Sequence, residues 1–278
     1  MTYLICADYL HKNKAEIVAK KLLSMGHNCL MDPTFSSADQ LVDSKRFSEV
    51  AGQDVDIIIS IGGDGTMLRT AQRALSYDKP VFGINAGRIG FLCAFEYDNF
   101  EKITEDELHG LRTNHRMILE VRMDQRPGEC YYALNDAVLN KGGVSKTIEL
   151  EIYTGNSLIG MYRADGVIVS TPTGSTGYSL SAGGPIVEPS IDAVLVTPIC
   201  AHVMFSRGIV LSGNEDVRIE PTLRNDTDIY LSVDSSFTFL LQSDCGVSVK
   251  RSDRTLRLLT SDKRDYYEMI NRRISKGE

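Results

Sequence analysis

The feature that most constrains the fold of this chain is an apolar run that ends in a glycine turn and leads into a helical pattern. The run Val55–Ile61 is typical of a strand buried on both faces, and Gly62-Gly63-Asp64-Gly65 follows it directly. From Thr66 to Leu75 the pattern is that of a helix. A strand, a tight turn and a helix in this order predict an α/β unit whose free helix N–H groups can face an anion.

The aspartate in this turn conflicts with simple anion binding. Its carboxylate repels a phosphate unless a metal ion lies between them or the carboxylate accepts a proton. Asp64 is therefore a candidate for deprotonating an alcohol, or for holding a hydroxyl in line for attack on a phosphoryl group. The alternative is a structural turn in which Asp64 only accepts hydrogen bonds.

The N-terminal part of the chain alternates between strand and helix patterns. Strands are predicted at Tyr3–Ala7, Asn28–Met31 and Pro80–Asn85, and a helix at Lys14–Met25. Such alternation implies a parallel sheet with right-handed crossovers. We therefore expect residues 1–115 to form a Rossmann-like α/β domain that binds its ligand at the carboxyl ends of the strands, where the glycine turn falls.

From Arg116 the pattern changes to runs that alternate apolar and polar residues between turn signals. We expect residues 116–261 to form a β-rich, sandwich-like domain with few helices. Its predicted strands include Met117–Met123, Tyr131–Leu139, Thr147–Tyr153 and Asp228–Val233. A helical pattern returns at Asp262–Lys276, and we expect a final helix within residues 262–278 that packs on the first domain. A terminal helix with a solvated face is the alternative.

Composition and charge narrow the class of protein. A chain of 278 residues forms one large or two ordinary domains, and its net charge of −7 argues against nucleic-acid binding. No apolar run reaches the roughly 18 residues of a membrane span, and the N-terminus lacks a signal-peptide pattern, so we expect a cytoplasmic protein without a membrane partner. The six cysteines and five histidines show no metal-ligand spacing, and we expect no metal site built by side chains.

A second polar segment lies in the β-rich part. Asp165-Gly166 opens an apolar run, and Ser170–Thr176 then gathers hydroxyls and a glycine in a stretch too polar for a core strand. Such a loop can surround phosphate or ribose with donors, and the ring of Tyr178 can stack on a base. An ordinary Ser/Thr-rich loop is the alternative. Asn135-Asp136 interrupts an apolar strand, which indicates a ligand contact or, alternatively, a β-bulge or strand end.

These segments together resemble the NAD kinase family, which uses ATP or polyphosphate. Gly62–Thr66 matches its first signature, and Asp165–Pro185 matches its long second signature with Gly177 in place of the common alanine. Gly83–Leu92 and Pro198–Arg207 resemble two further stretches of the family. The second signature separates this family from the phosphofructokinases and lipid kinases that share only the Gly-Gly-Asp-Gly turn.

The resemblance implies a role for each matching residue. Asp64 would be the catalytic base or positioning group for the adenosine 2′-hydroxyl of NAD, and the turn Gly62–Thr66 would hold the phosphates of the donor. Asn135 and Asp136, where the family usually has Asn-Glu, would hold ribose hydroxyls or the base, and Asp165 would meet the nicotinamide half. Further NAD contacts are implied for Gly65, Arg69, Lys146, Arg163, Thr176, Gly177, Tyr178, Ser179, Leu180 and Ser181. For the three basic residues of this set, a solvated charge is the alternative.

The same resemblance implies ATP as the donor, Mg²⁺ or another divalent cation to offset its charge, and a homodimer or homotetramer. The family often has Asp-x-Gln near Asp234, and here Ser236 replaces the glutamine, which leaves a contact from this loop open. Two other functions remain as alternatives: a lipid or sugar kinase, and a regulator that binds NAD or NADP without turnover. The residues alone do not separate ATP from polyphosphate, or NAD from NADH.

Overall fold

The chain divides into two compact units. The computed structural model describes residues 1–31, 43–44, 54–87, 90–143, 146–202, 207–222, 227–242, 244–261, 266–268 and 270–271. Unit 1 comprises residues Met1–His115 and Leu256–Glu278, and unit 2 comprises Arg116–Thr255. The sequence-based division ends the second domain at residue 261, whereas the chain returns to unit 1 at Leu256, because Leu258 pairs with Val81 there.

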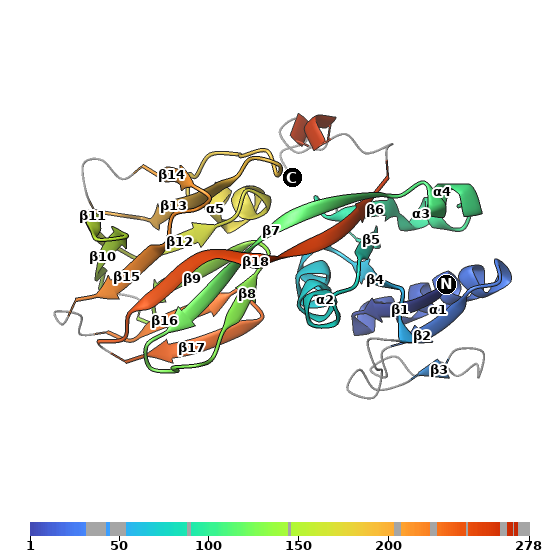
Figure 1. The fold of residues 1–278 in the computed structure, drawn as a ribbon, viewed down its shortest axis with the longest axis horizontal. Coiled ribbons are helices and arrows are strands. Elements are labelled where there is room, and N and C mark those ends of the chain that lie inside the picture. Colours follow the sequence, from blue (N-terminus) through green and yellow to red (C-terminus); the bar gives the residue numbers. More distant parts are fainter. Residues whose placement is uncertain are drawn as a thin grey trace. The chain divides into compact units, whose positions relative to one another are not determined.

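Unit 1 is built on a parallel sheet (Figure 1). The strand order is β3-β2-β1-β4-β5-β6, and the end of β18 pairs beside β5. The strands are β1 (Thr2–Ala7), β2 (Asn28–Met31), β3 (Asp43–Ser44), β4 (Ile57–Gly62), β5 (Val81–Asn85) and β6 (Cys93–Glu96). The helices are η1 (Tyr9–His11), α1 (Lys12–Ser24), α2 (Asp64–Tyr77), α3 (Tyr97–Phe100) and α4 (Glu105–His109).

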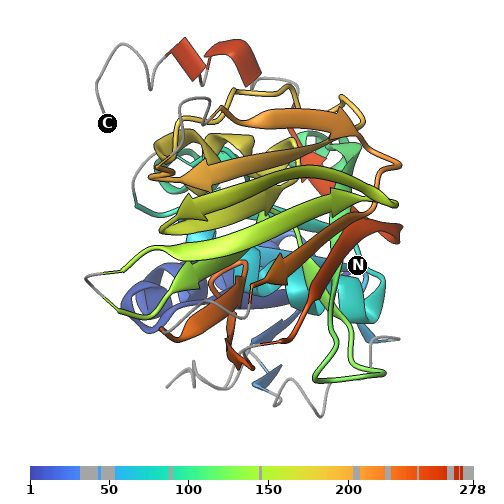
Figure 2. The same cartoon turned by 90° about the vertical axis from the view of Figure 1, so that its left-hand side faces the viewer.

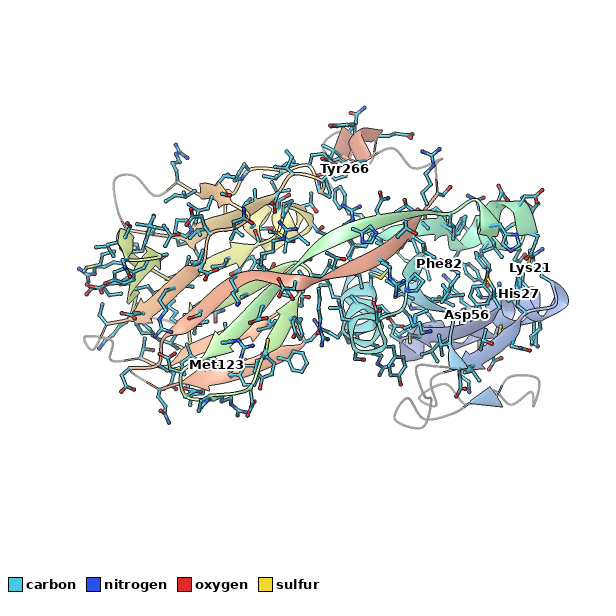
Figure 3. All side chains as sticks on the ribbon, viewed as in Figure 1. Lys21, His27, Asp56, Phe82, Met123 and Tyr266 are labelled. Atoms are coloured by element: carbon cyan, nitrogen blue, oxygen red, sulfur yellow. The ribbon has the colours of Figure 1, made fainter. Side chains whose placement is uncertain are left out.

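Buried aliphatic and aromatic side chains hold the helices of unit 1 on its sheet. Val18 and Leu22 of α1 pack in one cluster with Ile59 of β4 and with Phe82 of β5, which Figure 3 labels. Helix α2 buries the Met67 side of its surface. Burying such side chains contributes roughly 1.5–3 kcal/mol each, so the sheet and helices form one stable support for the turn after β4.

Unit 2 is almost entirely β-structure. Its strands are β7 (Arg112–Met123), β8 (Tyr131–Ala133), β9 (Asp136–Lys141), β10 (Ile148–Thr154), β11 (Ser157–Ala164), β12 (Gly166–Ser170), β13 (Ala193–Ile199), β14 (Ile209–Ser212), β15 (Val217–Pro221), β16 (Ile229–Val233), β17 (Phe237–Leu241) and β18 (Val247–Thr260), of which β7 and β18 also enter unit 1. Two short helical segments, η4 (Thr173–Thr176) and α5 (Tyr178–Ser181), follow β12.

Two antiparallel sheets of unit 2 enclose one core. One sheet has the order β14-β13-β12-β9-β16-β17, and the other contains β11-β10-β15-β18. Strands of unit 2 face the viewer in Figure 2. Leu139 and Val167 from the first sheet share a cluster with Leu150 and Ile219 from the second. Alternate residues of each strand point into this core, as expected for a β-sandwich. Strands β9 and β12 are central in the six-stranded sheet, and their ends carry the polar motifs of the sequence.

The structure confirms the mixed fold class, an α/β part followed by a β-sandwich, with local differences in where elements begin and end. Helix α2 begins at Asp64, two residues before the predicted start. The predicted strand Tyr131–Leu139 is two strands, β8 and β9, with a break before Asp136. No helix among the described residues is long and apolar enough to cross a membrane.

Only part of the predicted final helix is described. Residues 266–268 and 270–271 are helical, and Figure 3 labels Tyr266. The ring centroid of Tyr266 lies 6.4 Å from that of Phe91, and both residues belong to unit 1. The other residues of the predicted segment 262–278 lie outside the described residues, so the packing of a complete helix on the first domain stays a prediction.

Candidate functional site

The glycine turn of unit 1 joins β4 to α2 as the sequence predicts. Strand β4 ends at Gly62, Gly63 caps the helix, and Asp64 is its first residue. The N–H groups of Thr66 and Met67 bond to the carbonyl of Gly63, at 3.1 Å each. Helix geometry leaves the N–H groups of the first helical residues without an intrahelical acceptor, so they can bind an anion.

Gly62 is required by its close contact with the helix. A Cβ added to Gly62 would lie 2.5 Å from Oγ1 and 2.8 Å from Cβ of Thr66. No side chain fits in that space, so the turn can bring its backbone against α2 only with glycine at this position.

The carboxylate of Asp64 holds a neighbouring loop. Its Oδ2 accepts the N–H of Phe91 at 3.1 Å, and its Oδ1 accepts the N–H of Leu92 at 3.2 Å. A carboxylate has about four lone-pair positions, so two remain available to a further donor. The side chain is half-buried, and both roles considered for it, loop support and contact with a hydroxyl, are compatible with this geometry.

Side chains from the segment after β1 and from α2 form a hydrogen-bonded group beside this turn. Oδ2 of Asp8 accepts the hydroxyl of Thr66 at 3.1 Å, and its Oδ1 lies 2.6 Å from Nδ1 of His11. Arg69 is exposed and its guanidinium lies 3.5 Å from Oγ1 of Thr66, at the limit of a hydrogen bond. Gly65 is also exposed. The turn therefore presents an N–H-rich, partly cationic surface to solvent.

In unit 2 the two polar motifs of the sequence meet at one end of the six-stranded sheet. Asp136, the first residue of β9, is opposite Ser170, the last residue of β12. The N–H of Thr171 donates to the carbonyl of Asn135 at 2.9 Å, and the hydroxyl of Thr171 donates to the carbonyl of Leu134 at 2.6 Å. The structure thus brings together segments about 35 residues apart, as a ligand site made of both would require.

Several polar atoms at this place are buried without a partner. Among the described residues these include Oδ1 of Asn135, Oγ of Ser170 and Oγ1 of Thr173. Burial, and next the charge of Asp234, raise the pKa of Asp136 to about 7. Buried polar atoms without partners are costly, and their gathering here is the pattern of a site that a polar ligand completes.

The segment from Thr176, the last residue of η4, to Ser181 divides into buried and exposed residues. Thr176 and Ser179 are buried, and the Ser179 hydroxyl lies 2.9 Å from that of Thr197, so Ser179 supports the core. Tyr178 is 44% exposed, and Leu180 and Ser181 are exposed as well. Burial of part of its ring, and then the nearby Cys200, Asp136 and Asp165, raise the pKa of the Tyr178 phenol. Tyr178 is thus placed to stack on a planar group, with Gly177 half-buried beside it.

The remaining predicted NAD contacts lie elsewhere: Asp165 directly precedes β12, at the end opposite Ser170, whereas Arg163 is in β11 and Lys146 precedes β10 in the other sheet. Asp165 forms an ion pair with Lys141, with 2.6 Å between Oδ1 and Nζ. Arg163 and Lys146 are exposed. Exposure suits a solvated charge and a ligand contact equally, so the predicted NAD contacts of these two basic residues stay predictions.

One residue of this region is not among the predicted site residues. The carboxylate of Asp234 accepts the N–H groups of Leu134, Asn135 and Asp136. The sequence carries one indication, because the resemblance points to a family motif at this position. Because Ser236 replaces the glutamine of the family's Asp-x-Gln motif, the sequence alone does not show that Asp234 has a role in the site.

Comparison with known proteins assigns the family. The family model for the N-terminal domain of ATP-NAD kinases matches residues 4–111, and the model for the C-terminal domain matches residues 134–261. The chain belongs to the NAD kinase family. An NAD kinase from Trichlorobacter lovleyi is 40% identical over 227 residues, which cover 80% of this chain and 79% of that protein. The match over both domains makes the chain a phosphotransferase of the NAD kinase type.

Solved structures of NAD kinases share the fold. The structure of yeast NADH kinase complexed with NADH superposes with a TM-score of 0.84 at 23% identity, covering 99% of this chain and 87% of that one. An NAD kinase from Archaeoglobus fulgidus in complex with ATP has a TM-score of 0.77 at 22% identity, covering 99% of both chains. At these identities the likeness supports the fold of both units.

Proposed function

We propose that this chain transfers the γ-phosphoryl group of ATP to the adenosine 2′-hydroxyl of NAD and so forms NADP. The observation that carries the proposal is the carboxylate of Asp64 at the first residue of α2, beside free helix N–H groups. A carboxylate beside phosphates repels them, and the loop contacts of Asp64 leave lone pairs free, which favours a role in proton transfer over loop support alone. The family models and the ATP complex of the Archaeoglobus fulgidus enzyme support the two substrates.

In the proposed reaction Asp64 takes the proton of the 2′-hydroxyl. The oxygen attacks the γ-phosphorus, the bond to the β,γ-bridging oxygen breaks, and ADP leaves. A positioned general base typically contributes about 10²–10⁴-fold to the rate. The hydrogen bonds from Phe91 and Leu92 orient the carboxylate while leaving lone pairs for the hydroxyl.

The turn from Gly62 to Thr66 binds the donor phosphates in this proposal. The N–H groups of Asp64 and Gly65 supply hydrogen bonds, and the exposed guanidinium of Arg69 adds positive charge. Positioning of the two substrates contributes most of the acceleration, because phosphoryl transfer needs no covalent intermediate on the enzyme.

A divalent cation fits this reaction as part of the ATP substrate. Among the described residues, no group of three His, Cys, Asp or Glu side chains is suited to hold a metal ion. Mg²⁺ commonly keeps several waters and binds through substrate phosphates and one or two carboxylates, so a site with few protein ligands suits it. The cation offsets the charge of the triphosphate.

Unit 2 binds NAD in this proposal. The amide of Asn135 and the carboxyl of Asp136 hold ribose hydroxyls, the hydroxyl of Thr176 and the ring of Tyr178 contact the base, and Asp165 meets the nicotinamide half. Support comes from the unpartnered buried Oδ1 of Asn135 and from the exposed ring of Tyr178. A donor from the ligand would remove the cost of the buried acceptor.

We also propose a cytoplasmic homodimer or homotetramer that accepts polyphosphate as an alternative donor. Support for the assembly and for polyphosphate comes from the family resemblance of the sequence motifs, and support for the cytoplasm comes from the six scattered cysteines, which are all free thiols. Light scattering after gel filtration measures the assembly, and replacement of ATP by polyphosphate in the assay measures the donor range.

The test of the proposed function is a coupled assay for NADP formation from NAD, ATP and Mg²⁺, with wild type beside Asp64→Asn. We expect wild type to form NADP, and the variant to lose about 10²–10⁴-fold in kcat while keeping its circular dichroism spectrum and melting temperature. Near-normal turnover by the variant would remove Asp64 from the chemistry. Tight NAD binding without turnover by wild type, with either donor, would favour the regulator.

A further inference from the structure

One buried carboxylate in unit 2 holds three consecutive backbone N–H groups. Oδ2 of Asp234 accepts the N–H of Leu134 at 2.7 Å, and Oδ1 accepts those of Asn135 at 2.8 Å and Asp136 at 3.0 Å. In return, the N–H of Asp234 donates to the carbonyl of Asp136 at 3.0 Å. Four hydrogen bonds therefore fix the chain where β8 ends and β9 begins.

The turn that carries Asp234 has an unusual backbone. Asp234 and Ser235 have φ angles of +47° and +53°, in the left-handed region that non-glycine residues seldom adopt. This turn joins β16 to β17, and β16 pairs with β9 through Val233 and Ala137. Left-handed backbone at two successive residues is unfavourable by itself and persists where the surroundings require it. Here it directs the Asp234 side chain at the backbone of β9.

The segment Leu134–Asp136, which Asp234 holds and which we call the clamped segment, carries the side chains proposed to hold NAD. Asn135 has a buried Oδ1 without a partner among the described residues, and Asp136 is only 7% exposed. Asp234 is itself 3% exposed, so water competes little for its hydrogen bonds. The nearby charge of Asp234 also helps to raise the pKa of Asp136, after burial. The arrangement fixes both side chains before a ligand arrives.

Resting on the proposed function, we propose that Asp234 is a positioning residue for NAD: its carboxylate fixes the Leu134–Asp136 backbone and thereby aims the side chains of Asn135 and Asp136 at the dinucleotide. Asp234 touches neither substrate nor phosphate in this role. Its loss should therefore weaken binding of NAD and leave the use of ATP unchanged, because the donor turn belongs to unit 1.

The test compares two substitutions that keep the turn. Asp234→Asn tolerates a positive φ and keeps one acceptor oxygen, but places an NH₂ donor against an N–H donor; Asp234→Gly keeps the φ and removes all three bonds. We expect KM for NAD to rise about tenfold or more in both variants, more in Asp234→Gly, with KM for ATP changed less than about twofold. Calorimetric titration with NAD should show the same loss of affinity.

Asp78→Asn is the matched control. Asp78 has a φ of +50° and a side chain that is 92% exposed, and it contacts Arg257 within unit 1, whereas Leu134–Asp136 belongs to unit 2. This variant should keep both KM values. Melting temperatures of all variants separate a loss of folded protein from a loss of affinity.

Two outcomes would overturn the positioning role. One is a lower melting temperature of the Asp234 variants with KM for NAD as in wild type, which would make Asp234 a purely structural residue. The other is an equal rise in KM for NAD and for ATP. Failure of wild type itself to form NADP would instead contradict the proposed function. Calorimetric titration of the Asp234 variants with NAD would still test whether Asp234 positions the NAD-binding residues.

Discussion

Polar groups at the glycine turn of unit 1 are open to solvent, whereas those at the start of β9 in unit 2 are buried. In unit 1, Gly65 and Arg69 are exposed, and the Thr66 hydroxyl already has a partner in Asp8. In unit 2, Ser170 is fully buried and its hydroxyl has no partner among the described residues. The exposed groups of unit 1 suit a charged, hydrated ligand that binds and dissociates readily. The buried groups of unit 2 suit a ligand that forms the hydrogen bonds they lack.

The two regions also use aspartate differently. Asp64 is half-buried and accepts two N–H groups, with lone pairs left for a substrate. Asp234 is buried and uses its oxygens to bind three N–H groups of its own chain. From this difference we infer that unit 1 governs turnover and unit 2 governs affinity for NAD. Variants in each unit separate these two contributions.

Among variants that keep both aspartates, the largest effect is expected from a methyl group beside Asp64. A Cβ added to Gly90 would collide with Oδ1 of Asp64 and lie 3.0 Å from its Cγ. Because a side chain can turn away, we expect Gly90→Ala to fold normally while displacing the carboxylate. A misplacement of about 1 Å can cost about 10²-fold in rate, so kcat should fall by that order in the coupled assay.

Gly87→Ala is the control for this variant. An added Cβ at Gly87 meets nothing within 4 Å, so its kcat should equal that of wild type. If Gly90→Ala also keeps the wild-type kcat, the position of the Asp64 carboxylate does not matter for turnover.

The second-largest effect is expected at Gly174 in unit 2, where an added Cβ would meet backbone atoms instead of a side chain. A Cβ added to Gly174 would overlap the carbonyl of Asn135, 2.6 Å from its carbon atom. Backbone held by hydrogen bonds on both sides cannot move away cheaply. We expect Gly174→Ala to lose about 1–3 kcal/mol of unfolding free energy in urea and to lose NAD affinity.

Gly177→Ala provides the comparison, because its added Cβ would come no closer than 3.2 Å to its neighbours. It should lose less stability than Gly174→Ala. Equal stability of the two variants would show that the Asn135 carbonyl is not held firmly.

The third expected effect is a dependence of protein stability on pH that arises from Asp136 in unit 2. The pKa of Asp136 is raised from 3.8 to about 7, chiefly by burial and then by Asp234. A raised pKa in the folded state means that the protonated form stabilises the fold; this stability is fully present below the ordinary pKa of 3.8 and is lost as pH rises through about 7. Because a pKa difference of 1 corresponds to about 1.4 kcal/mol, the whole contribution is on the order of a few kcal/mol.

Melting temperatures of wild type and Asp136→Asn between pH 4 and pH 8 measure this effect. The melting temperature of Asp136→Asn should rise relative to that of wild type as the pH increases. Above pH 7 the difference between the two melting temperatures should stay constant. A constant difference over the whole range would contradict the raised pKa.

How much of the fold the sequence predicts depends on distance along the chain. The unit 1 turn is predictable because strand, glycine turn and helix are contiguous from Val55 to Leu75. The break between β8 and β9 is not, because the carboxylate that holds Leu134 comes from Asp234, 100 positions away. A local apolar pattern cannot show such a partner.

Individual site residues divide in the same way. The polarity of Asn135-Asp136 and of Ser170–Thr176 marks both segments as candidates, although only the structure shows that they meet. The sequence does not show that Ser179 faces the core and bonds to Thr197, since serine suits a core hydrogen bond and a ligand contact equally. Burial decides between these two uses, and burial depends on the whole sandwich.

The smallest effects are expected in the free energy of unfolding when one hydroxyl is removed from each region. Thr66→Val removes a hydrogen bond to Asp8 and should cost about 1 kcal/mol of unfolding free energy. Ser170→Ala removes a buried hydroxyl without a partner among the described residues, which is costly to bury, so this variant should lose no more than about 0.5 kcal/mol. Urea denaturation of both variants measures the difference, and a larger loss for Ser170→Ala would indicate a hydrogen bond that it makes in solution.

The most direct test of the inferred division between the units is steady-state kinetics of NADP formation by Asp64→Asn and Asn135→Ala, measured side by side with wild type. Asp64→Asn should lose kcat by about 10²-fold or more with KM for NAD changed only a few-fold, because the carboxylate acts on the reacting hydroxyl. Asn135→Ala should raise KM for NAD about tenfold or more and keep most of kcat. A fall in kcat alone for both variants, or a rise in KM alone for both, would contradict the division of turnover and NAD affinity between unit 1 and unit 2.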